Sequence, residues 1–272
     1  MTLRQLVQGL TRQSAPPVPV IGVACHSKQL RAGELFVAIR GPHQDGHDFL
    51  EEAMQRGACA LVVERPAPGD MRCPVIVVAD TKQALAVIAA RFYGQPASRL
   101  RLMGVTGTNG KTTTTYLLKA ILDAAGQQAG LLGTVAYEIG ERHLPSVNTT
   151  PGTLELQRYL SQMLEQDLSW CVMEVSSHAL DQGRIEGLRF DAAIFTNLGS
   201  DHLDYHRTLE RYAAAKRRLF SYLKADGRAF INVDDAYGQT LVEELQSQSV
   251  VTYGLERPAM VSVRHVSCSW QG

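Results

Sequence analysis

The segment at residues 104–115 constrains the possible folds of this chain most, because it reads Gly-Val-Thr-Gly-Thr-Asn-Gly-Lys-Thr-Thr-Thr-Thr. An apolar run precedes it from residue 100, and apolar residues at helical spacing follow it as far as Gly126. A strand, a glycine turn and a helix N-terminus form a phosphate site, since backbone N–H groups and the helix dipole attract an anion. Lys111 adds a full positive charge, and Thr112 offers a hydroxyl suited to Mg²⁺.

The segment departs from the strict phosphate-loop pattern at one position. That pattern places glycine where this chain has Val105, so the expected loop covers residues 107–112. An ordinary glycine turn between a strand and a helix is the alternative. The triplet Gly110, Lys111 and Thr112 in this context favours the phosphate loop.

Composition narrows the class of protein. A length of 272 residues suffices for two domains, and a hydrophobic fraction of 45% supplies their cores. Because 27 basic residues balance 27 acidic ones, the charge gives no argument for a nucleic acid or membrane partner. The five cysteines lack metal-type spacing, and the chain has neither a signal peptide nor a bilayer-length apolar stretch. We therefore expect a soluble cytoplasmic protein; its oligomeric state leaves no mark in the sequence.

The chain divides at a segment of linker composition, residues 94–98, which predicts domains at 1–97 and 98–272. Strands and helices alternate in both, so the expected fold class is α/β. The second domain should have a mostly parallel sheet with ligands at the carboxyl ends of its strands. A further strand is predicted close to the last residue, which indicates that the second domain is incomplete. Strands are predicted over residues 20–24, 34–39, 60–63, 75–78, 100–105, 131–137, 170–175, 192–197, 229–233, 250–253 and 260–268, and helices over residues 49–56, 81–93, 153–166, 209–223 and 236–245.

Polar residues follow three of these strands. Asn148, Thr149 and Thr150 precede Pro151, and a helix cap with proline in the first turn explains this pattern by itself. A cap at the carboxyl edge of a sheet also faces bound phosphates, so both interpretations are retained.

Glu174 ends an apolar strand, where a carboxylate is costly unless it is paired or bound to a metal. In a phosphate-loop protein such an acid usually organises Mg²⁺. Ser176 and Ser177 follow, but no general base or Gly-x-Ser-x-Gly turn accompanies them, which disfavours a serine nucleophile.

The third segment, residues 196–206, holds two histidines, His202 and His206, among aspartates. Zinc is a minority interpretation, because the segment lacks a His-Glu-x-x-His arrangement and follows a strand. Further on, Lys216 lies in a predicted helix between alanines and two arginines. Surface charge is the default for such a lysine, although close approach of a partner and reduced basicity caused by Arg217 and Arg218 are also conceivable.

These segments, in this order, resemble the Mur ligases, the ATP-dependent amide-bond-forming enzymes of peptidoglycan precursor synthesis. The likeness covers essentially the whole chain, and the relaxed phosphate loop with Val105 is typical of that family. The segments that carry it are residues 34–38, 45–49, 107–113, 148–151, 174–178, 196–197 and 201–206, together with Lys216.

The resemblance implies a ligase that uses ATP and Mg²⁺ to add the third stem-peptide amino acid to UDP-N-acetylmuramoyl-L-alanyl-D-glutamate. Its small-molecule partners would be this UDP-N-acetylmuramoyl dipeptide and a diamino acid, expected to be meso-2,6-diaminopimelate, with lysine as the alternative. ATP phosphates would be bound by Gly107, Thr108, Asn109, Gly110, Lys111, Thr112 and Thr113.

The resemblance also assigns the remaining roles. Lys111, His202 and Lys216 would be catalytic, the last as a carbamate formed with carbon dioxide. The metal ligands would be Thr112, Glu174, His202 and the Lys216 carbamate. The substrate would be held by Ser27, His43, Gln44, Asn148, Thr149, Thr150, Ser176, Gln182 and Arg184.

Two departures from the family remain. Residues 26–28 read His-Ser-Lys where the family usually has Asp-Ser-Arg, and no segment corresponds to the C-terminal domain that recruits the amino acid. A binding-only fragment or paralogue is therefore an alternative to an active ligase. Another Mur ligase or a folylpolyglutamate-type ligase is the alternative among enzymes.

Overall fold

The computed structural model describes residues 1–41, 44–66, 69, 71–245 and 249–263. The chain forms two compact units. The first unit contains Met1–Pro96 with the short segments Gly152–Ser161 and Ile185–Gly187, and the second contains the rest. The domain boundary between residues 97 and 98 stays a prediction, since this grouping also assigns two later segments to the first unit.

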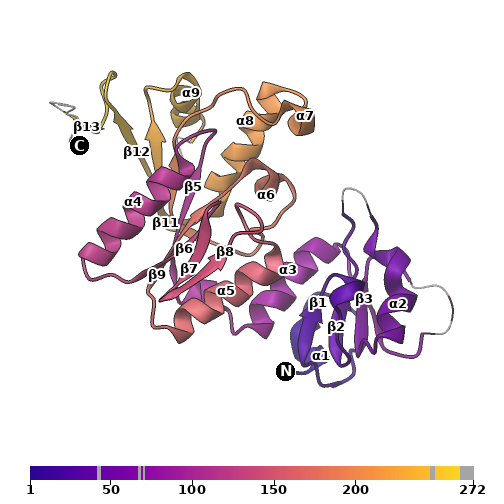
Figure 1. The fold of residues 1–272 in the computed structure, drawn as a ribbon. Coiled ribbons are helices and arrows are strands. Elements are labelled where there is room, and N and C mark those ends of the chain that lie inside the picture. Colours follow the sequence, from indigo (N-terminus) through magenta and orange to yellow (C-terminus); the bar gives the residue numbers. More distant parts are fainter. Residues whose placement is uncertain (42–43, 67–68, 70, 246–248, 264–272) are drawn as a thin grey trace. The chain divides into compact units, whose positions relative to one another are not determined.

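The first unit is built on a four-stranded parallel sheet with the strand order β1-β2-β3-β4 (Figure 1). Side chains alternate across it, so that Leu35 and Val37 enter one core while Phe36 enters the other. Its strands are Gly22–Ala24 (β1), Glu34–Val37 (β2), Ala60–Val63 (β3) and Val75–Val77 (β4). Its helices are Leu3–Val7 (α1), Leu50–Gln55 (α2) and Thr81–Phe92 (α3), with 3-10 turns at Ser27–Gln29, Gly46–Phe49 and Pro96–Ser98.

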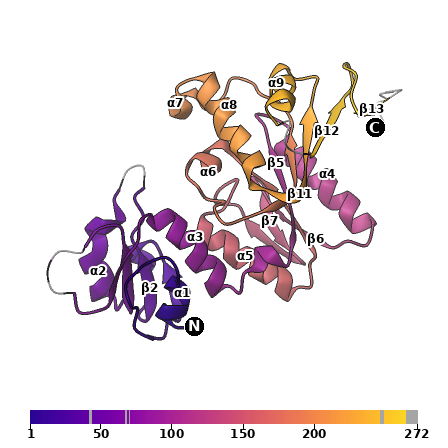
Figure 2. The same ribbon diagram turned by 180° about the vertical axis from the view of Figure 1, so that it is seen from behind.

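The second unit contains a nine-stranded sheet with the order β13-β12-β11-β10-β5-β9-β6-β7-β8 (Figures 1 and 2). The strands are Arg101–Thr106 (β5), Ala129–Leu132 (β6), Ala136–Ile139 (β7), Arg142–Pro145 (β8), Trp170–Glu174 (β9), Phe190–Phe195 (β10), Leu223–Asn232 (β11), Ser249–Gly254 (β12) and Val261–Ser262 (β13). The helices are Lys111–Ala124 (α4), Ser177–Asp181 (α6), Leu203–His206 (α7), Leu209–Arg217 (α8) and Ala236–Glu244 (α9), and Arg218–Tyr222 is a 3-10 turn. Helix Thr153–Glu165 (α5) is divided between the units, since its residues as far as Ser161 group with the first unit and the rest with the second.

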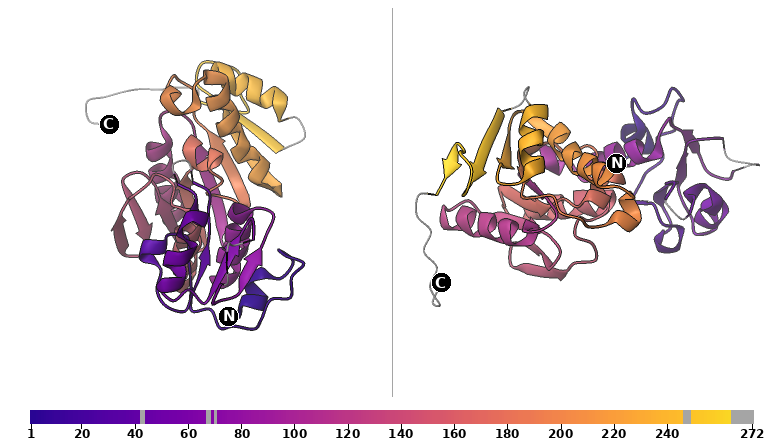
Figure 3. Two further views of the ribbon diagram at one scale, coloured as in Figure 1. Left: turned by 90° about the vertical axis from the view of Figure 1, so that its right-hand side faces the viewer. Right: turned by 90° about the horizontal axis from the view of Figure 1, so that it is seen from above.

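Strand β5 is the centre of this sheet, pairing in parallel with β9 on one side and β10 on the other. Its Val105 packs with Ile194 and with Leu118 of α4. The preceding Gly104 faces the opposite way, toward Phe190 and Leu219. Helix α4 therefore covers one face of the sheet, and α8 and α9 cover the other (Figure 3). The mostly parallel α/β fold expected from the sequence is confirmed.

Three predicted elements differ from the structure in number or by more than two residues at one end. Residues 131–137 are not one strand, since the chain turns at Gly133 and β6 and β7 pair antiparallel. A Cβ at position 133 would lie 2.5 Å from Glu174 Oε1, so any other residue there would displace the Glu174 carboxylate. The predicted helix 209–223 ends at Arg217 and continues as a 3-10 turn, and β11 begins six residues before the predicted residue 229. Of the predicted strand 260–268, residues 264–268 lie outside the described residues.

Candidate active site

The predicted phosphate loop joins the end of β5 to the start of α4, as the local sequence indicated. Gly110 has φ +81°, in the left-handed region that favours glycine. A Cβ at Gly107 would collide with Thr196 Oγ1. Val105 needs no such freedom, because it lies in the strand itself and is fully buried. Position 105, where the strict pattern has glycine, therefore lies in the strand and not in the turn, so valine is accommodated there.

Residues after β10 hold this loop in place. Thr196 Oγ1 donates to Asn109 O at 2.6 Å, while Asn109 N donates to Asn197 Oδ1 at 2.9 Å. The side chain of Thr108 is also engaged, since its Oγ1 accepts from Gly199 N at 2.8 Å. Thr196, Asn197 and Gly199 thus hold the phosphate loop in its conformation.

Lys111 folds back over the loop. Its Nζ donates to Gly107 O at 3.0 Å and to Thr108 O at 2.8 Å. Burial lowers the pKa of this amine, and the nearby Glu174 and Asp201 carboxylates oppose the effect. The ammonium is therefore held at the loop by neutral carbonyls and lines the cavity described below.

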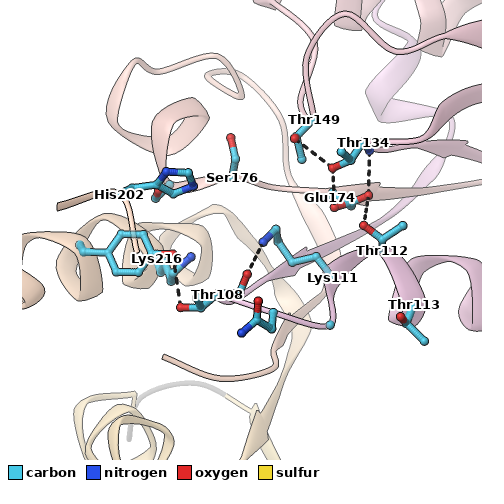
Figure 4. A pocket seen from close by; sticks show the side chains of 14 residues that line it. Thr108, Lys111, Thr112, Thr113, Thr134, Thr149, Glu174, Ser176, His202 and Lys216 are labelled. Atoms are coloured by element: carbon cyan, nitrogen blue, oxygen red, sulfur yellow. Dashed lines mark hydrogen bonds between the residues drawn. The ribbon is translucent and has the colours of Figure 1, made fainter. Parts of the chain in front are cut away.

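Glu174 is buried at the end of β9, as its place in the sequence predicted, and three donors satisfy it. Thr112 Oγ1 and Thr134 N donate to its Oε1 at 3.0 and 2.8 Å, and Thr134 Oγ1 donates to its Oε2 at 3.1 Å (Figure 4). Thr112 and Glu174 thereby place hydroxyl and carboxylate oxygens side by side. Such hard oxygens are the ligands that Mg²⁺ prefers.

Asn148, Thr149 and Thr150 lie in the segment before α5 and make different contacts. Thr149 Oγ1 is 3.0 Å from Thr134 Oγ1, and Thr149 lines the cavity. Thr150 is fully buried; its hydroxyl donates to Glu174 O at 2.9 Å and accepts from Ser176 N at 3.0 Å. Thr150 therefore joins two loops, whereas Asn148 is exposed.

Arg184 and Gln182 extend from the end of α6 toward the same loop. The Arg184 guanidinium donates to Gln182 Oε1 at 2.8 and 3.0 Å and to Thr150 O at 2.9 Å. Ser176 caps α6, with its Oγ accepting from Ala179 N. The structure thus brings these three predicted substrate residues to the loop that holds Thr149.

Three histidine rings gather beside α8. His178 lies edge-on to His202, with ring centroids 4.8 Å apart, and 5.5 Å from His206. His206 Nε2 is 3.0 Å from Ser177 Oγ, and burial lowers the pKa values of His178 and His206. His202 has φ +53°, a left-handed conformation, and lines the cavity.

Lys216 is almost fully buried, which its place among charged residues of a predicted helix did not indicate. Its Nζ donates to Gly107 O at 2.6 Å and lies 4.2 Å from the Tyr212 ring centroid. Burial, and secondarily the charge of Lys111, lowers the pKa of this amine to about 7. The expected contribution of Arg217 and Arg218 is wrong, because the second charge comes from the phosphate loop.

Most of the predicted phosphate- and metal-binding residues surround one cavity of about 360 Å³ (Figure 4). Its lining does not include Gly107, Asn148, Thr150, Gln182 or Arg184. Thr134 and Tyr212 also line it, although neither is predicted as a site residue from the sequence. A Gly-Thr pair directly after an apolar run was the available signal for Thr134. The lining residues are Thr108, Asn109, Gly110, Lys111, Thr112, Thr113, Thr134, Thr149, Glu174, Ser176, Ser177, His202, Tyr212 and Lys216.

The described residues contain no cluster of three or more histidine, cysteine or acidic side chains arranged to hold a metal ion. The histidine cluster accordingly gives the zinc interpretation no support. Thr112 and Glu174 instead match a cation that takes further ligands from phosphate, as Mg²⁺ does.

The predicted uridine contacts lie in the first unit. Ser27 is buried, and its hydroxyl donates to Glu52 Oε2 at 2.7 Å. Gln44 is exposed and accepts a hydrogen bond at its carbonyl from Gly41 N. His43 lies outside the described residues.

The fold and the site together define a phosphate-loop α/β protein with a parallel sheet and a lysine buried beside the loop. The Mur ligase middle domain matches residues 105–272, and the Mur ligase family catalytic domain matches residues 19–93. The chain therefore belongs to the Mur ligase family.

Similar proteins indicate which members of the family this chain resembles. The chain is 45% identical over 253 residues to UDP-N-acetylmuramoyl-L-alanyl-D-glutamate–2,6-diaminopimelate ligase of Geobacillus thermodenitrificans, covering 91% of this chain and 51% of that protein. The same ligase of Geobacter sulfurreducens is 46% identical over 257 residues, covering 92% and 50%. A solved structure of a ligase with this name has a TM-score of 0.81 at 30% identity, covering 94% and 53%. The chain thus spans about half the length of these relatives. Within the described residues, no helix has the length and apolar character to cross a membrane.

Proposed function

We propose that this chain is part of an ATP-dependent ligase that joins a diamino acid, meso-2,6-diaminopimelate, to UDP-N-acetylmuramoyl-L-alanyl-D-glutamate. The supporting observation is the convergence of two amines on one phosphate-loop carbonyl, Gly107 O, at 3.0 Å from Lys111 and 2.6 Å from Lys216. Burying the Lys216 amine beside the loop is costly, and a lysine without a function would remain on the surface. A site that forms an acyl phosphate, in contrast, needs cations and metal ligands around the transferred phosphate.

The proposal divides the work between two domains. Residues 1–97 would hold the uridine end of the substrate through Ser27 and residues 43–44, and residues 98–272 would hold ATP. We place the reaction in the cytoplasm, because soluble nucleotide-linked substrates and ATP are available there.

The reaction needs an activated carboxylate, because a carboxylate itself is a poor acyl donor. The carboxylate oxygen of the D-glutamyl residue would attack the γ-phosphorus of ATP, and ADP would leave. The amine nitrogen of the diamino acid would then attack the acyl carbon, the bond from that carbon to the phosphate oxygen would break, and the amine would lose a proton. Lys111 would neutralise the transferred phosphate, and the loop N–H groups would orient it.

Thr112, Glu174, His202 and a carbamylated Lys216 would hold Mg²⁺, which supplies charge neutralisation for the phosphates when bound. Lys216 suits carbamate formation, since a pKa of about 7 leaves much of the amine neutral at neutral pH. The neutral nitrogen bonds to the carbon of carbon dioxide and releases a proton. The product is an anion in place of a cation.

Calorimetric titration of the 272-residue chain with Mg²⁺-ADP and with UDP-N-acetylmuramoyl-L-alanyl-D-glutamate tests the binding part of the proposal. Phosphate release by the complete product of the gene, with the UDP-dipeptide and either diaminopimelate or lysine, tests the chemistry. We expect both ligands to bind and diaminopimelate to give the faster release. Release that requires a folate, or binding with no release by the complete product, would overturn the proposed reaction.

A further inference from the structure

We infer that Thr134 is a positioning residue that couples nucleotide binding to binding of the UDP-dipeptide. It does so by orienting Glu174 and by bonding to Thr149 on the opposite loop. This inference rests on the proposed function, because the two ligands are those of the proposed reaction. It assigns a role to a residue that takes part in neither the phosphate loop nor the expected substrate segment.

Thr134 holds both oxygens of one carboxylate. Its backbone N–H reaches Glu174 Oε1 at 2.8 Å, and its hydroxyl reaches Oε2 at 3.1 Å. Because Glu174 is only 1% exposed, these donors replace the water that would otherwise solvate the charge. Two bonds from one residue also fix the plane of the carboxylate. The third donor, Thr112 Oγ1, belongs to the phosphate loop, so the plane of Glu174 is set relative to that loop.

The hydroxyl protons have one consistent arrangement. Thr134 Oγ1 has a single proton, which it gives to Glu174 Oε2. The contact of 3.0 Å between Thr134 Oγ1 and Thr149 Oγ1 must then use the Thr149 proton. Donation therefore runs from Thr149 to Thr134 to Glu174, and Thr149 offers a ligand only its lone pairs. Figure 4 shows this series of contacts from Thr149 through Thr134 to Glu174. A change in the hydrogen bonds of Glu174 at the nucleotide end consequently alters the Thr149 hydroxyl at the other end.

The segments that carry these residues are fixed on both sides. The chain can place Thr134 here because Gly133 has no Cβ to strike Glu174. On the other side, the buried Tyr137 hydroxyl donates to Asn148 O at 2.5 Å and accepts from Asn148 N at 3.1 Å. Since both backbones are anchored, the hydroxyls bear the adjustment when a ligand binds.

The experiment measures a coupling factor. The dissociation constant of Mg²⁺-AMPPCP is determined by calorimetry on the 272-residue chain, with and without saturating UDP-dipeptide, and the reciprocal titration gives a second estimate of the same factor. We expect each ligand to tighten the other by about fivefold or more in the wild type, the usual lower range of such coupling. Thr134→Val should reduce the factor to within about twofold of one, and Thr134→Ser should preserve it.

Two further variants keep the result interpretable. Thr149→Val breaks the same chain of hydroxyls from the other end, so it should remove the coupling equally, and combining it with Thr134→Val should add nothing. Thr240→Val replaces an exposed threonine of α9 and should leave the factor unchanged. Full coupling in Thr134→Val, or wild-type binding of both ligands without coupling, would overturn the inference alone. Failure of the wild type to bind either ligand would overturn the proposed function as well.

Discussion

Replacing Lys216 with methionine removes a buried amine whose protonation opposes folding. In the folded chain the pKa of this amine is about 7, against an ordinary value of 10.5. At 1.36 kcal/mol per pH unit, this difference corresponds to a penalty of about 5 kcal/mol for the charged form at low pH. Methionine has a similar length and no charge, while the lost hydrogen bond to Gly107 O costs about 1 kcal/mol.

The sign of the pH dependence follows from proton counts. Between pH 7 and pH 10.5 the unfolded chain binds more protons at Lys216 than the folded chain, so wild-type stability rises with pH across this window. The full penalty is present below pH 7, and it falls to about 2 kcal/mol at pH 9. Lys216→Met should therefore be more stable than the wild type by roughly 4 kcal/mol at pH 6 and by roughly 1 kcal/mol at pH 9.

Urea unfolding in buffers free of carbon dioxide measures this difference, because a carbamate would alter the titration. Trp270→Phe in every variant leaves Trp170 of β9 as the fluorescent reporter. Lys119→Met is the matched control, since Lys119 is a helical lysine paired with Asp123 at 2.7 Å and its pKa is raised. A stability difference for Lys216→Met that stays constant from pH 6 to pH 9, or a loss of stability at pH 6, would refute the reasoning.

Three further substitutions have direct readouts. Lys111→Ala should abolish ATP turnover by the complete gene product and weaken ADP binding by this chain at least about 100-fold, because a half-buried positive charge at the phosphate loop is lost; near-normal turnover would contradict the loop assignment. Gly107→Ala should destabilise the second unit by more than about 2 kcal/mol in urea unfolding, since its Cβ collides with Thr196 Oγ1; an unchanged midpoint would contradict it. Tyr137→Phe should cost about 1–3 kcal/mol of stability and weaken UDP-dipeptide binding more than ADP binding, because Asn148 loses both bonds to the hydroxyl; equal weakening of both ligands would argue against a local role.

Much of the fold was predictable because its signals are local. The strand at β3 lies where its apolar run predicted, over Ala60–Val63, and Glu174 ends β9 as expected. The β6–β7 turn was not predictable, since residues 131–137 form an almost continuous apolar run that reads as one strand, and Gly133 in that run approaches a carboxylate 41 residues further along the chain. The predicted helix is likewise split after Arg217, where the 3-10 turn that follows buries Leu219 and Phe220.

The sequence by itself determined the phosphate loop, because a strand, a glycine turn and a helix N-terminus act within about ten residues. Only the tertiary structure decided what surrounds it. Glu174 meets Thr134 across 40 residues, and Lys216 meets Gly107 across 109, through the pairing of parallel strands and the packing of α8. The pKa of Lys216 depends on burial and on a neighbouring charge, and neither is encoded in the alanines and arginines beside it.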